Sequence, residues 1–217
     1  MAKFLPSVIC VMCLLGFSIQ AQTYAKQKVE VTKSDVAIQT DAQQNWSIDS
    51  INKSTWSGNL GRGQFPVYAR AQVMLNNLHA SPGAIDGKSG KNFLKALAAY
   101  QQIQALPVTG ELDKQTWDSL LKNQKTAAFG AYQITTEDIK GPYVKSIPRN
   151  YALQSKMRGL YYTRVTEMLG EKFHIDEDFL KQINPKVNFK KVGETILVPI
   201  VRNDLPQDIA LIIAHKP

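Results

Sequence analysis

The stretch from Val67 to Leu121 most constrains the fold, because two helical apolar patterns flank one turn-rich loop there. The residues of the first pattern recur at the spacing of one helical face: Val67, Ala71, Met74 and Leu78. The second pattern consists of Phe93, Leu97, Tyr100 and Gln104. The loop between them, Ile85–Gly90, holds Asp-Gly and a second glycine, which favour a tight turn. The sequence therefore predicts two helices joined by a structured loop.

A third, shorter helix is predicted after Leu112. Asp113 is placed to accept a hydrogen bond from the first turn of that helix. Leu112 and Trp117 stand on either side of this cap, at the spacing of a hydrophobic staple. At the other end of the unit, Pro66 stands where the first helix can begin. We therefore expect a three-helix unit with two glycine-containing loops.

This unit resembles the peptidoglycan-binding domain of cell-wall enzymes. The matching positions are Ala71-Gln72, Leu75, Ile85-Asp86-Gly87, Gly90, Ala96-Leu97, Tyr100-Gln101, Gly110, Leu112-Asp113, Thr116 and Leu120. They cover about a quarter of the 217 residues. The resemblance implies a helical fold and a peptidoglycan ligand, either the glycan strands or the stem peptides.

The first 21 residues are typical of a secretory signal peptide. Lys3 supplies the positive start, Val8–Phe17 is the apolar core, and Ile19-Gln20-Ala21 offers a cleavage site. The apolar run is too short for a comfortable bilayer span. We expect an exported protein of the periplasm or cell envelope, with no stable membrane span after cleavage.

The formal net charge is +8, and it becomes +7 if Lys3 is removed with the signal peptide. Such a surplus suits an anionic polymer or a membrane surface. Nucleic acid is not expected, because the basic residues are scattered among acidic ones and the chain is predicted to be exported. A helix-turn-helix is also disfavoured, since Ala80–Gly90 is far longer than its usual turn.

A second compact pattern begins near Tyr151. It predicts a helix over 165–173, a helix starting at Asp176 or Asp178, and a strand over 193–199. Residues 173–199 resemble the second half of a LysM module, a family that binds N-acetylglucosamine polymers. The fold class predicted for the whole chain is therefore mainly α: a three-helix peptidoglycan-binding domain followed by a small α+β LysM-like module.

The order of these parts is similar to the front half of exported L,D-transpeptidases, which cross-link peptidoglycan stems. Residues 208–216 resemble the first strand of their catalytic domain. The expected divisions are a signal peptide (1–21), a polar leader (22–63), the peptidoglycan-binding domain (64–122), a linker arm (123–150), the LysM-like module (151–201) and a truncated tail (202–217).

No catalytic residue, cofactor or metal site is predicted. The transpeptidase reaction needs a cysteine thiolate activated by a histidine, in a Ser-x-Gly-Cys stretch implied by the family. The cysteines of this chain are Cys10 and Cys13, both inside the predicted signal peptide. His79, His174 and His215 are far apart in sequence, which does not suggest a metal site.

The expected function is non-catalytic peptidoglycan (murein) binding. The alternative is that the chain is the N-terminal fragment of an L,D-transpeptidase, whose catalytic part is absent or encoded separately. Candidate ligand-binding residues with planar or polar side chains that suit a glycan are Arg70, Asp86, Lys88, Asn92, Tyr100 and Gln101. The LysM resemblance implies three more, in the loop that it places at the sugar groove: Asn184, Lys186 and Asn188. Of these, Tyr100 is equally compatible with a place in the core, and Asp86 with turn chemistry.

Overall fold

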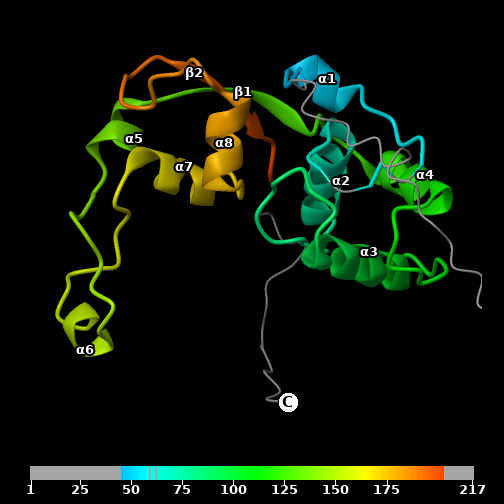
Figure 1. Cartoon of the computed structure of the whole chain (residues 1–217), viewed down its shortest axis with the longest axis horizontal. Coiled ribbons are helices and arrows are strands. Elements are labelled where there is room, and N and C mark those ends of the chain that lie inside the picture. Colours follow the sequence, from blue (N-terminus) through cyan, green and yellow to red (C-terminus); the bar gives the residue numbers. More distant parts are fainter. Residues whose placement is uncertain (1–44, 59, 62, 203–217) are drawn as a thin grey trace, which may run out of the picture. The chain divides into compact units, whose positions relative to one another are not determined.

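The computed structural model describes residues 45–58, 60–61 and 63–202 (Figure 1). The expected signal peptide, most of the polar leader and the tail from 203 onward lie outside these residues. In chain order the elements are α1 (Ile48–Asn52), α2 (Pro66–Asn77), α3 (Lys91–Ile103), α4 (Lys114–Asn123), β1 (Phe129–Gln133), α5 (Thr136–Lys140), α6 (Tyr151–Gln154), α7 (Val165–Lys172), α8 (Glu177–Ile183) and β2 (Thr195–Pro199).

The mainly helical expectation is confirmed for the described part of the chain, which has eight helices and one two-stranded antiparallel sheet. The three-helix unit is α2, α3 and α4. Pro66 begins α2 as expected, and the Asp113 carboxylate accepts a hydrogen bond from Thr116 N at 2.7 Å to cap α4. Across the described ranges, no helix has the length and apolarity needed to cross a membrane.

The three helices bury a shared group of apolar side chains, here called the first core. Its members are Val67, Tyr68, Ala71, Met74, Leu75, Ala80, Phe93, Ala96, Leu97, Tyr100, Leu112, Trp117 and Leu120. Tyr100 is 0% exposed and so belongs to the core, which resolves the ambiguity that the sequence left at this position.

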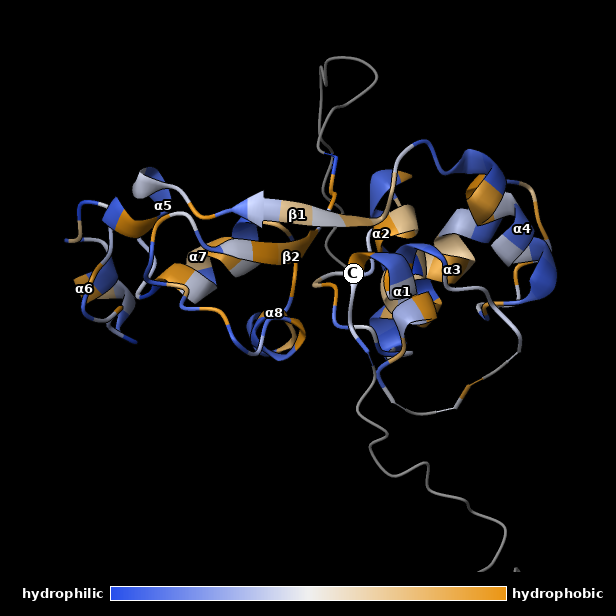
Figure 2. Cartoon of the chain, turned by 90° about the horizontal axis from the view of Figure 1, so that it is seen from above, coloured by the Kyte–Doolittle hydropathy of each residue, from blue (hydrophilic) through white to orange (hydrophobic). Residues whose placement is uncertain are grey.

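The C-terminal part of the described chain is a second module, in which β1 and β2 pair antiparallel and lie side by side in Figure 2. Their register runs from Phe129 opposite Pro199 to Gln133 opposite Thr195. The predicted α7, α8 and β2 are present. The segment expected to be a linker arm, 123–150, contains β1, the strand that pairs the backbone groups of β2. A lone strand leaves such groups unpaired, so the module needs this segment.

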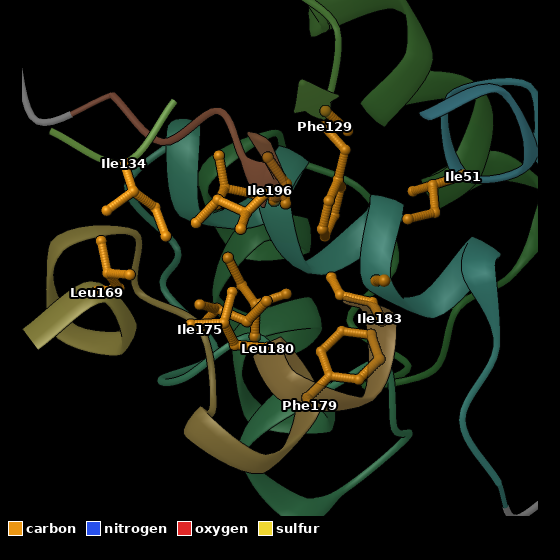
Figure 3. Packing of buried hydrophobic residues seen from close by; sticks show 14 residues of the cluster. Ile51, Phe129, Ile134, Leu169, Ile175, Phe179, Leu180, Ile183 and Ile196 are labelled. Atoms are coloured by element: carbon orange, nitrogen blue, oxygen red, sulfur yellow. The ribbon is translucent and has the colours of Figure 1, made fainter. Parts of the chain in front are cut away.

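The second module has its own buried cluster, here called the second core (Figure 3). It contains Ile51, Ala69, Val73, Ile85, Ala128, Phe129, Ile134, Leu169, Ile175, Phe179, Leu180, Ile183, Ile196 and Val198. Ile51 comes from α1, which lies in the later part of the expected polar leader 22–63. In α1, the Asn52 side chain donates to Phe129 O at 2.8 Å and accepts from Ala128 N and Phe129 N, each at 2.9 Å.

Helix α2 serves both cores. Ala71 and Leu75 pack in the first core, whereas Ala69 and Val73 pack in the second. Near the end of α2, Asn77 donates to Ile200 O at 2.8 Å, just after β2. The three-helix unit and the second module are therefore packed together rather than separated by an arm.

Candidate functional site

The loop between α2 and α3 is held by one buried glutamine. Gln72 Oε1 accepts hydrogen bonds from Asp86 N at 3.1 Å and Gly87 N at 2.8 Å. Its Nε2 donates to Asp86 Oδ1 at 2.8 Å. Gly87 has φ of +70°, and a Cβ there would lie 3.2 Å from Phe179 Cζ. The Asp86 carboxylate thus completes a turn, in agreement with the turn chemistry considered for Asp-Gly.

Gln101 likewise fixes the loop between α3 and α4 through the hydrogen bonds of its buried amide. It is 0% exposed, and its Oε1 accepts from Thr109 N at 3.0 Å and Gly110 N at 2.9 Å. Its Nε2 donates to Thr116 Oγ1 at 2.9 Å and Glu111 O at 3.0 Å. Every polar group of this amide is engaged inside the fold, so the structure gives Gln101 a framework role instead of the ligand contact we expected.

Tyr100 and Arg70 also have framework roles. The Tyr100 hydroxyl lies 2.8 Å from Ser119 Oγ in a hydrogen bond. The Arg70 guanidinium donates to Ser54 O at 2.6 Å and lies 5.5 Å from the centre of the Trp117 ring. Burial lowers the pKa of this guanidinium, and its Nε is buried without a hydrogen-bond partner among the residues that the structure describes. Neither side chain is presented as the ligand platform that the sequence suggested.

Lys88 and Asn92 remain exposed, and Asn92 lines an open hollow beside α3. The hollow has a volume of about 430 Å³. Its walls are the turn after α2 and one stripe of α3: His79, Ala80, Ser81, Pro82, Gly83, Asn92, Lys95, Ala96 and Ala99. A second cavity, beside the end of α2, measures only about 50 Å³, well below the ~300 Å³ at which ligand pockets begin.

The chemistry of the hollow is mixed. Ala96 and Ala99 are small, so the α3 stripe leaves space above an apolar floor. Around that floor stand an amide (Asn92), an ammonium group (Lys95) and an imidazole (His79). His79 has φ of +62°, which turns the chain sharply after α2. Lys95 was not among the residues that the sequence singled out, although the alanines one turn apart beside Asn92 and Lys95 are visible in it.

In the second module, Asn184 is buried, whereas Lys186 and Asn188 are exposed. Asn184 Nδ2 donates to Leu197 O at 2.9 Å, and its Oδ1 accepts from Leu197 N at 2.7 Å. It therefore joins α8 to β2, which is a framework role and not the exposed groove position that we expected. Lys186 and Asn188 lie on the surface loop that follows.

Residues 68–120 match the family model described as "Putative peptidoglycan binding domain". The matched range runs from Tyr68 in α2 to the buried Leu120 in α4 and includes both glutamine-held loops. No curated protein matches the chain. The three-helix unit is thus a peptidoglycan-binding domain, and a domain of this class indicates a location in the cell envelope.

Proposed function

We propose that this chain is a non-catalytic peptidoglycan-binding protein of the cell envelope. The observation that carries the proposal is the family match over 68–120, on a three-helix unit whose two loops are each held by a buried glutamine. The non-catalytic part rests on the sequence, in which Cys10 and Cys13 are the only cysteines. Both lie in the predicted signal peptide, so the remaining residues offer no thiol nucleophile.

The hollow beside α3 is the proposed ligand site. Its volume of about 430 Å³ falls within the ~300–1,000 Å³ of small-molecule pockets. Peptidoglycan carries acetamido and peptide groups, which an Asn92 amide can bind by hydrogen bonds, and stem-peptide carboxylates, which the Lys95 ammonium can pair with. The apolar floor suits the less polar faces of a sugar or of an alanine side chain.

The second module is proposed to be LysM-like and to add a weaker contact with the glycan. Its support is the arrangement of α7, α8 and the β1–β2 pair, together with the resemblance of residues 173–199. Lys186 and Asn188 are two of the exposed polar residues of its α8–β2 loop. They are the positions through which this module would contact a sugar.

A second candidate function is a role in an L,D-transpeptidase system. The observation that favours it is the order of a peptidoglycan-binding domain and a helix–helix–strand module. Reading the adjacent DNA for a Ser-x-Gly-Cys frame tests this candidate directly.

The ligand site is tested by sedimentation with purified sacculi. The double variant Asn92→Ala/Lys95→Gln removes an amide and a charge from the hollow. Lys114→Gln/Gln115→Ala removes the same two groups from the exposed face of α4 and serves as the matched control. Weaker binding of the first variant alone supports the site. Equal binding of both variants and the parent chain would place the ligand elsewhere.

A further inference from the structure

Residues 144–161, here called the basic loop, project from the second module without joining either core. Tyr143 and Tyr162 form a parallel bridge at its base, and Val144 N donates to Tyr162 O at 2.9 Å. Helix α6 lies within the loop and has no buried residue. Figure 1 shows α6 at the end of two extended segments. None of the loop's side chains belongs to the first or the second core.

The base of the loop, in contrast, is tied firmly to the module. The Asp138 side chain is 5% exposed and accepts hydrogen bonds from Tyr132 Oη at 2.7 Å and Lys172 Nζ at 2.9 Å. The Tyr143 hydroxyl donates to the Asp138 carbonyl. The fold therefore fixes the base of the loop, whereas many side chains of the loop itself are exposed.

All the charged side chains of the basic loop are positive. The loop contains Lys145, Arg149, Lys156 and Arg158 and no acidic residue. All four cations are exposed, and none forms an ion pair with any residue that the structure describes. Elsewhere, in contrast, Arg164 and Lys181 both pair with Glu177. The loop thus presents uncompensated positive charge.

The same loop exposes large apolar side chains. Tyr151 is 84% exposed, Leu160 63% and Leu153 51%. None of these side chains packs in either core. Leucines do not complement the hydroxyl groups of a glycan, but their transfer from water into the acyl boundary of a bilayer lowers the free energy. Tyrosine favours the membrane–water interface, where its ring is buried and its hydroxyl stays hydrated.

From the combination of charge and apolar exposure, we propose that the basic loop binds the surface of an anionic lipid bilayer. Tyr151, Leu153 and Leu160 enter the interface, while the four cations contact lipid phosphates. Each cation near such a surface strengthens binding by about fivefold. An acidic protein surface is the other class that this chemistry fits, but it would also need a groove shaped for these side chains, whereas a bilayer needs none. The proposal is independent of the peptidoglycan site in the three-helix unit.

The test is co-sedimentation of the full chain with phosphatidylcholine vesicles, with and without phosphatidylglycerol. One variant removes the loop charges (Lys145→Gln, Arg149→Gln, Lys156→Gln, Arg158→Gln). A second removes its apolar groups (Tyr151→Ser, Leu153→Ser, Leu160→Ser). A matched control removes four exposed charges elsewhere (Lys53→Gln, Lys114→Gln, Lys122→Gln, Lys190→Gln). All should keep the parent melting temperature, because none of these residues is in a core.

The parent chain is expected to bind phosphatidylglycerol vesicles more tightly than neutral ones, with both loop variants weakened at least tenfold and the control weakened less. Hydrogen exchange on the full chain locates the contact, since amides of 144–161 should gain protection only with anionic vesicles. Unchanged exchange in 144–161, or equal losses in the loop and control variants, would overturn the proposal. Loop-dependent cross-linking to an envelope protein without any vesicle binding would also overturn it, in favour of a protein partner.

Discussion

Ile85 and Ile175 pair through their backbones in a parallel bridge. Ile85 N donates to His174 O at 2.8 Å, and Asp176 N donates to Ile85 O at 3.0 Å. Both isoleucine side chains are buried, at 0% and 3% exposure. Ile85 lies in the matched 68–120 segment and Ile175 lies between α7 and α8. The peptidoglycan-binding domain is therefore stabilised by a module outside its family match.

The first prediction is that the two parts unfold together. Ile175→Ala should lower the free energy of unfolding by about 2–5 kcal/mol, because it leaves a cavity in the second core. Chemical unfolding combined with hydrogen exchange should show α3 and β2 losing protection in one transition. Val192→Ala is a control at a side chain that is 49% exposed, and should change stability by less than ~0.5 kcal/mol. Two separate transitions would contradict this coupling.

The second prediction compares neighbouring glutamines on α3. Gln101→Ala should cost about 2–4 kcal/mol, since the partly buried Thr109 N and Gly110 N lose their acceptor and the buried Thr116 hydroxyl loses its donor, and each orphaned group costs up to ~1–3 kcal/mol. Gln102→Ala, at the next and exposed position, should cost less than ~0.5 kcal/mol. Urea titration followed by circular dichroism measures both. Similar values for the two variants would show that the loop does not depend on the buried amide.

The third prediction separates the asparagines of the second module. Asn184→Ala should lower the free energy of unfolding by about 2–3 kcal/mol, because its bonds to Leu180 O and to both backbone groups of Leu197 are lost. Asn188→Ala should be close to neutral, since that side chain is exposed. Thermal unfolding monitored by circular dichroism distinguishes them. If Asn188→Ala proved the more destabilising change, Asn184 would not be the joint between α8 and β2.

The fourth prediction concerns acid stability. The pKa of Glu177 is lowered from 4.5 to about 2, chiefly because Arg164 donates hydrogen bonds to its carboxylate; burial opposes this change, and Lys181 and Thr166 reinforce it. The folded state then binds fewer protons than the unfolded state between these two values. The stabilisation is present above about pH 4.5 and is lost as the pH falls toward 2.

Glu177→Gln should therefore lower the free energy of unfolding at neutral pH by about 1 kcal/mol, a value that allows for solvent screening of the half-exposed Arg164. It should also make the free energy of unfolding fall less steeply as the pH is lowered. Urea midpoints measured from pH 7 to pH 2 test this. Glu171→Gln, at an exposed position without an ion pair among the described residues, is the control. A decline in Glu177→Gln as steep as in the parent chain would assign the acid sensitivity to other groups.

Local sequence signals predicted the five longer helices, α2, α3, α4, α7 and α8, but not the short helices α1, α5 and α6. Pro66 and the Asp113 cap gave the starts of α2 and α4, and Asp176 caps α8 by accepting from Phe179 N at 2.9 Å. Each of these signals acts within one helical turn, so it can be read without knowledge of the rest of the fold.

Long-range pairing was not predicted. Tyr132 pairs with Ile196 across more than sixty residues, and nothing in a five-residue segment reveals its partner. The same applies to Trp46, whose ring lies 5.0 Å from that of Phe179, and to the bridge at Ile85. Residue type was also a poor guide to the site, because buried amides such as Gln101 and Asn184 have the same chemistry as amides that bind sugars. Exposure, which depends on the tertiary fold, decides between these roles.

Sedimentation of the purified full chain with isolated sacculi at physiological salt tests the central claim most directly. Peptidoglycan binding by the three-helix domain predicts saturable recovery in the pellet, with release when solubilised peptidoglycan fragments are added as competitors. A chain that remains in the supernatant at every sacculus concentration would contradict the account.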